Sequence, residues 1–592
     1  MHIIHDIKSR HMRDYIESIA DYISSTELFY KLPLIVDLKI IDLEIVNHWI
    51  EWLYKLTKEH EFTPLLWDRN YPPSIIATAN ALLVLTKGRK CELDYIVNAL
   101  NNRRSKIGFW SEIHSTIPIL KKILPFEWNY TRLSVYTSLR VLKAMSTYGY
   151  EDIVLDFIRR LENIQGRSGL WITDGRGDIE LTAFILLYCN EYLSEVSKER
   201  AINALRSWLE EQLYLAINVN ILKKTLVSLA LIASGYVEVE FRNLLEYVKT
   251  LLSVQTPSGS LDYTPNRSNR KWITIEIMEH ASKHIPELRH RLKRYIHRNI
   301  IKMDSVHKVL ENIEKSATEY FRELLEENIL RGIKTNSMKI YLLLLSSIFE
   351  QFHWVENRDA IEYLSKFKSI IHEEKLQRLD NEKRVYRALR KSLPNRIGNN
   401  TVHKLATTVS ALYRFFSNYS MNNLKEFYGD LFKYTIKTVS TVLDPDTDLD
   451  KVSNLANALR IGASEGPSIR LLCTTLRSYP CIGVNTIASF IYYITKVFNI
   501  VDIDDVLSIE IPLDYRLIDI LSRTGVMKRG RNISTREDLN RIAFELSPED
   551  KLKILALRYL WMNYCTKGRY LHIPAAKCPL KGICSCRLLP RF

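Results

Sequence analysis

The sequence predicts an all-α protein. Over roughly the first 300 residues, apolar residues recur three and four positions apart, the spacing of one helix face, and Gly, Pro and Asn mark the turns. Amphipathic stretches such as VHKLATTVSALYRFF and LKEFYGDLFKYTIKTV follow after residue 396. The hydrophobic share of 46% and the charged share of 26% are those of a soluble globular protein. With 592 residues, we expect two large helical domains, each able to bury its own core.

The charge balance predicts a polyanionic partner. The formal net charge is +15 and the pI is near 9.2. Nucleic acid or an acidic membrane surface would fit, and so would a thermophile's Lys- and Arg-rich surface with no partner. The first residues carry charges throughout and resemble no secretory signal, and the longest apolar runs are too short to span a membrane. We therefore expect a cytoplasmic protein that does not enter a membrane.

The N-terminal region contains an irregular repeat. Four segments share a short loop with Gly or Trp followed by an apolar helix, at intervals on the order of 40 to 90 residues. Their loops lie around Trp67, Trp110, Trp171 and Gly259. The third reads Gln165-x-x-x-Gly169-x-Trp171 and the fourth Gln255-x-x-x-Gly259. Glycine permits a tight turn, while Gln and Trp can join the loop to a neighbouring helix end.

This pattern resembles the QxxxGxW repeat of squalene cyclases and protein prenyltransferases. The resemblance covers residues 60 to 290 and implies an α/α toroid, in which paired helices stack into a ring. An isoprenoid enzyme seated in this toroid is one alternative. The cyclase acid motif has a counterpart in Asp502-Ile503-Asp504-Asp505, but that stretch lies outside the repeats and is read as a solvated loop. Prenyltransferases need a zinc site, and Cys91 and Cys189 have no ligand spacing around them. Cys189 is expected in the core, and we expect the toroid to serve as a binding platform that could recruit a protein partner.

A charged helical region from 301 to 395 follows, and it could belong to either domain. The apolar run from 338 to 349 within it must be buried. Leu393-Pro394-Asn395 predicts a helix end, because the residue before proline is driven out of the helical region.

The stretch from Tyr479 to Arg516 predicts a helix–turn–helix followed by a single carboxylate. YPCIG forms the turn, VNTIASF opens an apolar helix, and IPLDYR closes the stretch. The backbone N–H groups near Gly483 to Asn485, together with the helix dipole, would form a seat for a phosphate. The plainer interpretation is an ordinary helical core, with Asp514 as a helix N-cap after Pro512.

YPCIGVNTIAS resembles the helix-hairpin-helix of endonuclease III-like DNA glycosylases, and IPLDYR resembles the element that carries their catalytic aspartate. The resemblance implies that Asp514 is that aspartate and that Cys481, Gly483 and Asn485 bind a DNA phosphate. Cys481 replaces the first hairpin glycine of the family. Asn485 stands where bifunctional members carry a Schiff-base lysine, so the resemblance implies base excision without strand cleavage.

Four of the eight cysteines lie in the last 28 residues: Cys565, Cys578, Cys584 and Cys586. In a reducing compartment such a cluster indicates a metal site before disulfides. The glycosylase family holds a 4Fe-4S cluster by C-x6-C-x2-C-x5-C, and here the spacing is C-x12-C-x5-C-x-C. Cys578 and Cys584 match the final pair, Ala575 stands where the second ligand is expected, and Cys586 could complete the set. Zinc, with His572 as a further ligand, and cysteines without metal are the alternatives.

The sequence thus predicts a toroid-like domain over 1–300, a charged connector over 301–395, a helix-hairpin-helix glycosylase-like domain over 396–564 and a metal loop over 565–592. The expected function is base excision from double-stranded DNA by a monofunctional N-glycosylase. In that reaction the target base leaves the duplex, and Asp514 stabilises the oxocarbenium-like state and directs the attacking water. The alternative is a DNA-binding protein on the same scaffold without catalysis.

Overall fold

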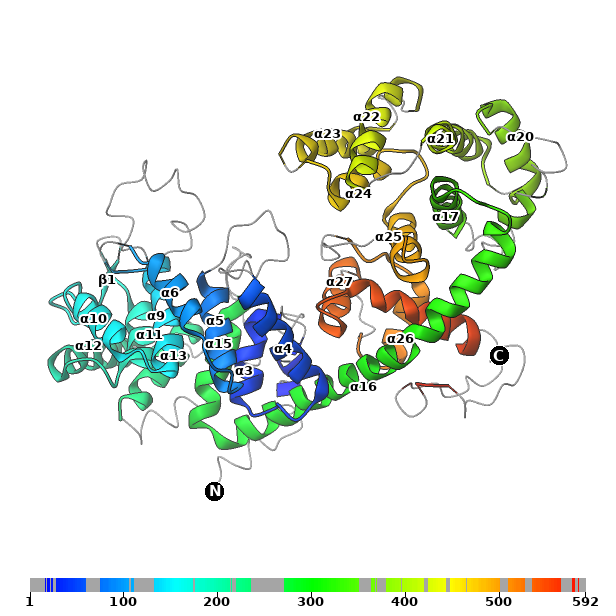
Figure 1. Ribbon diagram of the computed structural model, residues 1–592. Helices are drawn as coiled ribbons and strands as arrows, with labels where there is room; N and C mark the ends of the chain where they lie inside the picture. Colours follow the sequence, from blue (N-terminus) through cyan, green and yellow to red (C-terminus); the bar gives the residue numbers. More distant parts are fainter. Residues whose placement is uncertain are drawn as a thin grey trace. The chain divides into compact units, whose positions relative to one another are not determined.

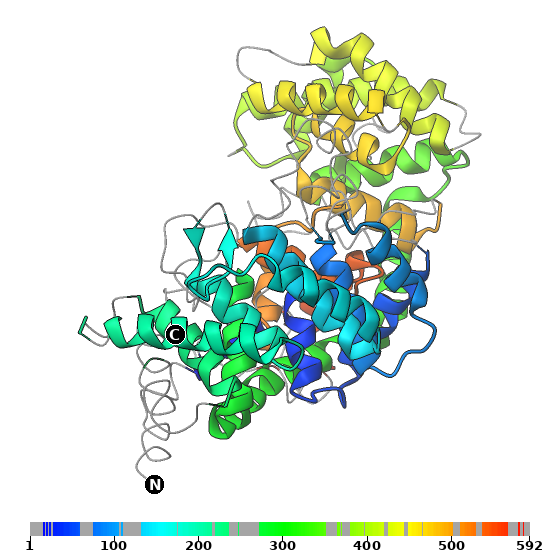
Figure 2. The same cartoon turned by 90° about the vertical axis from the view of Figure 1, so that its left-hand side faces the viewer.

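In the computed structural model the described residues form helices and one short hairpin, which confirms the all-α prediction (Figure 1). The hairpin joins β1 (Ile172–Thr173) and β2 (Arg176–Gly177) in antiparallel register, drawn as cyan arrows in Figure 2. None of the helices in the described ranges combines the length and the apolar character needed to cross a membrane. The structure describes residues 16–17, 19–21, 23–24, 28–59, 75–105, 108–110, 132–173, 176–212, 214–215, 220–235, 247, 271–350, 364–367, 369, 379–395, 397–419, 424–442, 448–464, 466–500, 509–527, 535–565, 578–580 and 584.

The chain forms two compact units, residues 1–304 and residues 305–592. The long helix α16 (Pro286–Leu325) contributes its first part to the first unit and its second part to the second. The charged region up to residue 395 therefore lies in the second unit from residue 305 onward.

The helices of the first unit form a closed ring within the described residues. Helix α3 packs against α5, α5 against α9, α9 against α11, α11 against α13, α13 against α15, and α15 returns to α3. A second set of helices lies outside this ring: α4 and α6 contact α5, α10 contacts α9, and α12 contacts α11 and α13. The bounds are α3 (Leu28–Asp37), α4 (Glu44–Glu59), α5 (Ile75–Lys87), α6 (Asp94–Asn102), α9 (Arg132–Tyr148), α10 (Glu151–Glu162), α11 (Ile179–Cys189), α12 (Glu195–Gln212), α13 (Ile221–Ala233) and α15 (Lys271–His284).

The sequence explains which helices lie inside. Helix α11 buries residues on every face, including Cys189, as expected for a helix covered on all sides. Helix α10 buries only Val154, Phe157, Ile158 and Leu161, whose spacing of three and four defines a single apolar face. Burial on all faces and burial on one face thus alternate along the chain, which produces two layers of helices.

The loop between α10 and α11 carries the Gln-Gly-Trp motif, and its side chains make the contacts that the motif predicts. Gln165 donates from Nε2 to the carbonyl oxygen of Gly169 at 2.9 Å. Trp171 is fully buried and donates from Nε1 to the carbonyl of Leu161 at 2.8 Å, which ties the loop to the end of α10. Gly169 has φ +85°, and a Cβ there would lie 2.3 Å from the carbonyl oxygen of Arg200. Only glycine fits this position.

The loop after α6 has the same construction with a different donor. Arg104 stands four residues before Gly108, as Gln165 does before its glycine, and donates from Nε to the Gly108 carbonyl at 2.8 Å. Gly108 has φ +95°. Trp110 is buried and donates to the carbonyl of Leu100 at 2.7 Å. This repeat is therefore R-x-x-x-G-x-W, whereas the loops around Trp67 and Gly259 lie outside the described residues.

The second unit packs its helices in two groups joined by α17 and α25. Helices α20 to α24 form one group, in which α20 contacts α21, α21 contacts α22, and α24 packs on both α22 and α23. The second group consists of α26, α27, η5, α28 and η6, in which α27 and α28 contact η5, and α26 contacts α28 and η6. Helix α17 contacts α21 and α25, and α25 contacts η5. The bounds are η2 (Glu326–Leu330), α17 (Asn336–Glu350), α20 (Glu382–Ser392), α21 (Asn399–Asn418), α22 (Leu424–Val442), α23 (Leu449–Ser464), α24 (Ile469–Arg477), α25 (Val484–Tyr492), η3 (Tyr493–Val497), α26 (Tyr515–Arg523), α27 (Thr535–Leu546), η5 (Lys551–Ala556), α28 (Leu557–Leu560) and η6 (Trp561–Cys565).

Two local predictions are confirmed in this unit. The apolar run from 338 to 349 lies in α17, where most of its side chains are buried. Helix α20 ends at Ser392, and Leu393, which precedes the proline, is extended with φ −88° and ψ 153°.

Candidate functional site

The hairpin between α24 and α25 has the predicted helix–turn–helix form. Tyr479 is buried at the end of α24, and its hydroxyl lies 2.9 Å from that of Thr435. Cys481 has φ +59°, a left-handed conformation that a side chain adopts at a cost of roughly 1 kcal/mol and that glycine adopts freely. This is the position at which the resemblance expects a glycine. Gly483 follows as the N-cap of α25, and among the described residues no side chain caps this helix.

The turn lies beside a second helix N-terminus. The thiol of Cys481 is 3.8 Å from the carbonyl oxygen of Thr401, in the first turn of α21. The N-cap of α21 is Gly398, and this helix too has no capping side chain in the part of the chain that the structure describes. From the other side Lys451 donates from Nζ to the carbonyl of Ile482 at 2.6 Å. Two positive helix ends and a lysine therefore meet at one turn.

The three residues predicted to bind phosphate lie at this turn with different exposure. Gly483 and Asn485 are exposed, and a Cβ at Gly483 would meet nothing within 4 Å. Cys481 is half-buried, and burial raises the pKa of its thiol to about 11. The thiol is therefore neutral near pH 7 and does not repel an anion.

Asp514 is the buried N-cap of α26, as the plainer interpretation expected. Its Oδ1 accepts from the backbone N–H of Arg516 at 2.9 Å. The guanidinium of Arg516 donates from Nε to Oδ1 at 2.9 Å and from Nη2 to Oδ2 at 2.7 Å, and Arg558 donates from Nε to Oδ2 at 2.7 Å. Burial alone would raise the pKa of Asp514, but the two guanidinium groups outweigh it and hold this pKa well below its usual range.

Arg558 joins the aspartate to the hairpin helix. It is buried in α28 and donates from Nη1 to the hydroxyl of Ser489 in α25 at 2.7 Å. The same nitrogen lies 3.4 Å from Glu350, which accepts from the hydroxyl of Tyr493 at 2.5 Å. Asp514 and Glu350 thus balance two arginines in one network. A carboxylate whose two oxygens are held this way is a weak base, so the network holds the helices together more readily than it activates water.

The structure describes three of the four tail cysteines. Cys565 ends η6, Cys578 and Cys584 are half-buried, and Cys586 lies outside the described residues. Within the described ranges no three His, Cys, Asp or Glu side chains are placed to hold a metal ion together. The 4Fe-4S cluster and its zinc alternative stay predictions, which the metal content of the purified protein tests. The acidic stretch Asp502–Asp505 also lies outside the described residues.

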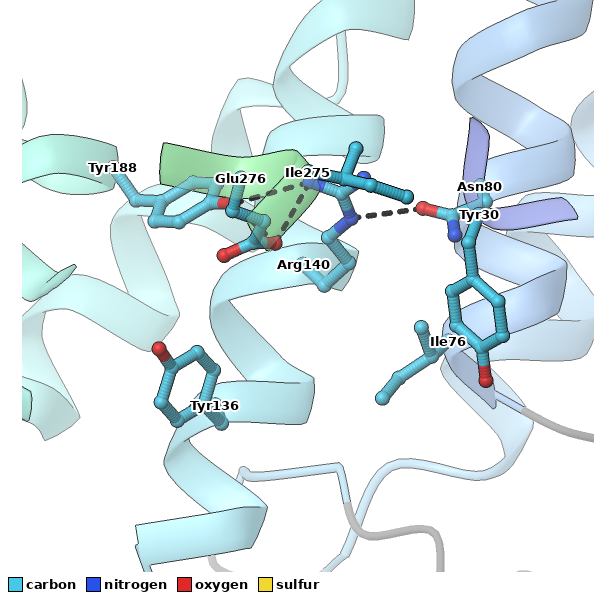
Figure 3. Close-up of a pocket in the computed structure, with 8 residues that line it drawn as sticks. All are labelled: Tyr30, Ile76, Asn80, Tyr136, Arg140, Tyr188, Ile275 and Glu276. Carbon is cyan, nitrogen blue, oxygen red and sulfur yellow. Dashed lines mark hydrogen bonds and ion pairs between the residues drawn. The ribbon is translucent and has the colours of Figure 1, made fainter. Parts of the chain in front are cut away.

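Sequence reasoning missed a buried charged cluster at the centre of the first unit (Figure 3). Arg140 of α9 donates from Nη1 to Glu276 of α15 at 2.9 Å and to the hydroxyl of Tyr188 at 3.1 Å, and from Nε to Asn80 at 2.8 Å. These groups line a cavity of about 40 Å³, with room for only a few waters. Burial raises the pKa of Glu276 despite the nearby guanidinium.

The cluster continues along α9 and α15. Lys143, one turn after Arg140, forms an ion pair with Glu279, whose side chain is only 1% exposed. Arg140 and Lys283 also lie 3.8 and 3.7 Å from this carboxylate. Together these cations outweigh burial and hold the pKa of Glu279 well below its usual range. The available signal was the pair of glutamates inside the apolar run WITIEIMEHA, since a carboxylate in such a run is either exposed or paired.

Comparison with known proteins finds no family model, no curated protein and no solved structure that matches this chain. The resemblances drawn from the sequence therefore rest on the residues described above.

Proposed function

We propose that this protein binds double-stranded DNA and that the turn between α24 and α25 seats a backbone phosphate. One observation carries the proposal. The uncapped N-termini of α21 and α25 meet at the turn, where the left-handed Cys481 leaves Gly483 exposed. Helix N-termini bind phosphates through their N–H groups and their dipole, and a glycine N-cap lets the phosphate approach closely.

The distribution of charge also favours the second unit, which contains the hairpin, as the unit that binds DNA. Residues 305–592 contain 43 Lys and Arg against 32 Asp and Glu, a net charge of +11. Residues 1–304 contain 40 against 36, a net charge of +4. Most of the positive charge therefore accompanies the hairpin, as expected of a surface that neutralises phosphates.

Binding without catalysis is the version that the contacts favour. A glycosylase would use Asp514 to direct water, and both oxygens of this carboxylate accept from Arg516 and Arg558 in a site that is 4% exposed. Base excision is the second candidate, because Arg558 links Asp514 to Ser489 in the hairpin helix. Asp514 and the hairpin helix α25 therefore belong to one hydrogen-bond network.

The ring of the first unit supports the α/α-toroid interpretation, with inner and outer helices alternating along the chain. We regard it as a platform for a protein partner. The isoprenoid alternative receives no support from the central cavity of about 40 Å³, which is filled by charged side chains and is far smaller than the roughly 300 to 1,000 Å³ of small-molecule pockets.

The phosphate seat is tested by Gly483→Asp. Gly483 has the extended conformation of an N-cap and open space around it, so an aspartate should cap α25 and leave stability within a few tenths of a kcal/mol. Its carboxylate would occupy the phosphate seat. We expect affinity for a fluorescent duplex to fall about tenfold, ~1.4 kcal/mol. The slope of the logarithm of the binding constant against the logarithm of the salt concentration should decrease by about one phosphate contact.

Ser468→Asp is the matched control. Ser468 is the N-cap of α24, and its side chain accepts from the N–H of Leu471, a bond that aspartate also makes. The change adds the same charge at the far end of the helix that leads into the turn, roughly 13 Å away. Equal losses of affinity in the two variants would reduce the effect to net charge and would reject the phosphate seat.

Base excision is tested separately with duplexes that carry damaged or mispaired bases, followed by hot alkali. Alkali-dependent strand breaks made by the wild-type protein would establish the second candidate. DNA binding without any such break would support binding alone.

A further inference from the structure

A cleft opens at one end of the inner ring of the first unit. It has a volume of about 330 Å³ and is formed where α9, α11, α13 and α15 end. Its polar lining includes Lys143, Ser146, Asn190, Tyr192 and His280. Four helix C-termini bring their partial negative charges to this cleft. These partial charges offset part of the positive charge of Lys143 and Lys283, which also line the cleft.

Lys143 lies in the wall of the cleft beside more cations than carboxylates. The charged side chains within ion-pair distance in this cluster are Arg140, Lys143, Lys283, Glu276 and Glu279. Among the described residues three cations thus share two carboxylates, and all of these side chains are largely buried except that of Lys283, which is 40% exposed. Arginine keeps its proton at any accessible pH, so the buried lysine is the member that can lose its proton. Loss of that proton still leaves both carboxylates paired.

Burial lowers the pKa of Lys143 to about 8, and Arg140 and Lys283 add to this effect against the attraction of Glu279. The groups that face the amine from the packed helices also include Tyr188, His280 and Glu276. The phenol of Tyr188 stays protonated, because burial raises its pKa well above the ordinary value. His280 stays neutral, because burial lowers its pKa well below 6.5.

Two polar atoms in the cleft wall have no hydrogen-bond partner among the residues that the structure describes. His280 is 5% exposed, and its Nε2 is buried and unpartnered. Asn190 donates from Nδ2 to the carbonyl of Ala233 at 3.0 Å, which fixes the orientation of the amide and leaves its buried Oδ1 without a partner. Buried polar atoms are rarely left unsatisfied, so these two atoms are available to hydrogen-bond water or a polar ligand in the cleft. The hydroxyls of Ser146 and Tyr192, 2.5 Å apart, add further donors and acceptors.

We propose that Lys143 is a nucleophilic amine that forms an imine with a small hydroxylated aldehyde or ketone bound in this cleft. The lone pair of Nζ attacks the carbonyl carbon, and the carbonyl oxygen takes two protons that come from the amine. The oxygen leaves as one water, and a C=N bond remains on Lys143. Protonation of this imine gives a cation, which Glu279 and the helix C-termini stabilise. The ligand hydroxyls pair with Asn190 and His280. This activity is independent of the DNA-binding proposal.

The test uses the full-length protein with glycolaldehyde and sodium cyanoborohydride, which reduces an imine to a stable hydroxyethyl amine. Peptide mass spectrometry then gives the extent of modification of each lysine. At pH 7 an amine with a pKa of about 8 has about 300 times the neutral fraction of an ordinary lysine with a pKa of 10.5. We expect Lys143 to be modified first, by a wide margin over the exposed Lys223.

Two further measurements separate the site from general aldehyde reactivity. Modification of Lys143 should reach half its maximum near pH 8, whereas modification of Lys223 should keep rising to higher pH. The preference should vanish in urea, which removes the cleft. Lys143→Arg keeps the positive charge and should leave the other lysines with unchanged modification. Modification of Lys143 no faster than that of Lys223, or a preference that persists in urea, would overturn the proposal.

Discussion

Asp514→Asn separates a structural aspartate from a catalytic one. Asparagine keeps the volume and one oxygen, so it can still accept from the N–H of Arg516 and cap α26. It loses the charge, and its amide N–H₂ faces the guanidinium groups of Arg516 and Arg558, which are themselves donors. Two buried arginines then share Glu350 alone. Breaking a buried ion pair in this way costs about 3 to 5 kcal/mol.

Hydrogen exchange followed by mass spectrometry measures this loss locally. We expect the free energy of opening for peptides from α25 and α26 to fall by about 3 to 5 kcal/mol. Asp430→Asn is the control, because Asp430 is 43% exposed and its pair with Lys433 should contribute less than about 1 kcal/mol. An Asp514→Asn protein with unchanged exchange in these helices would refute the structural reasoning.

The same contact has a defined pH dependence. The pKa of Asp514 is held below its unfolded value of 3.8, so the unfolded chain takes up the proton first as the pH falls. The stabilisation from this carboxylate is complete above about pH 5 and declines as the pH falls through 3.8. The difference in the free energy of unfolding between the wild-type protein and Asp514→Asn should therefore shrink as the pH falls below 4.

Two further predictions concern the first unit. Gly169→Ala and Gly149→Ala both place a side chain at positive φ, but only the first brings Cβ to 2.3 Å from the carbonyl oxygen of Arg200. In urea unfolding Gly149→Ala should cost about 1 kcal/mol and Gly169→Ala at least twice that, and equal losses would show that the contact is unimportant. The pKa of Lys143 falls from 10.5 to about 8 on folding, so stability should rise by about 1 to 2 kcal/mol from pH 8 to 9.5. The rise should be absent in Lys143→Met, and a flat wild-type profile would contradict the assignment.

Local structure was the part of this protein that the sequence could predict. Pro480 and Gly483 mark the hairpin, and Pro512 precedes the Asp514 cap, so each boundary has a chemical cause within a few residues. The partners of Asp514 could not be predicted in the same way. Arg558 lies 44 residues away, and only packing brings it to the carboxylate.

The charged cluster was missed for a related reason. The sequence around Arg140 and Lys143 carries no signal of burial, because charged residues are exposed in most helices. Their burial depends on Glu276 and Glu279, which lie 136 residues away. The two glutamates inside an apolar run indicated exposed or paired carboxylates, but the sequence does not show which cations pair with them.

The two glycine loops of the first unit also connect neighbouring helices around the ring. Each loop donor has a spare N–H that reaches the next outer helix: Arg104 pairs with Asp156 of α10 at 2.6 Å, and Gln165 donates to the Ser197 carbonyl of α12 at 2.8 Å. Asp156 is 42% exposed, so salt screens its ion pair with Arg104, whereas the contact between Gln165 and Ser197 is a neutral hydrogen bond. Raising the ionic strength should therefore loosen the ring beside α10 before it loosens the ring beside α12.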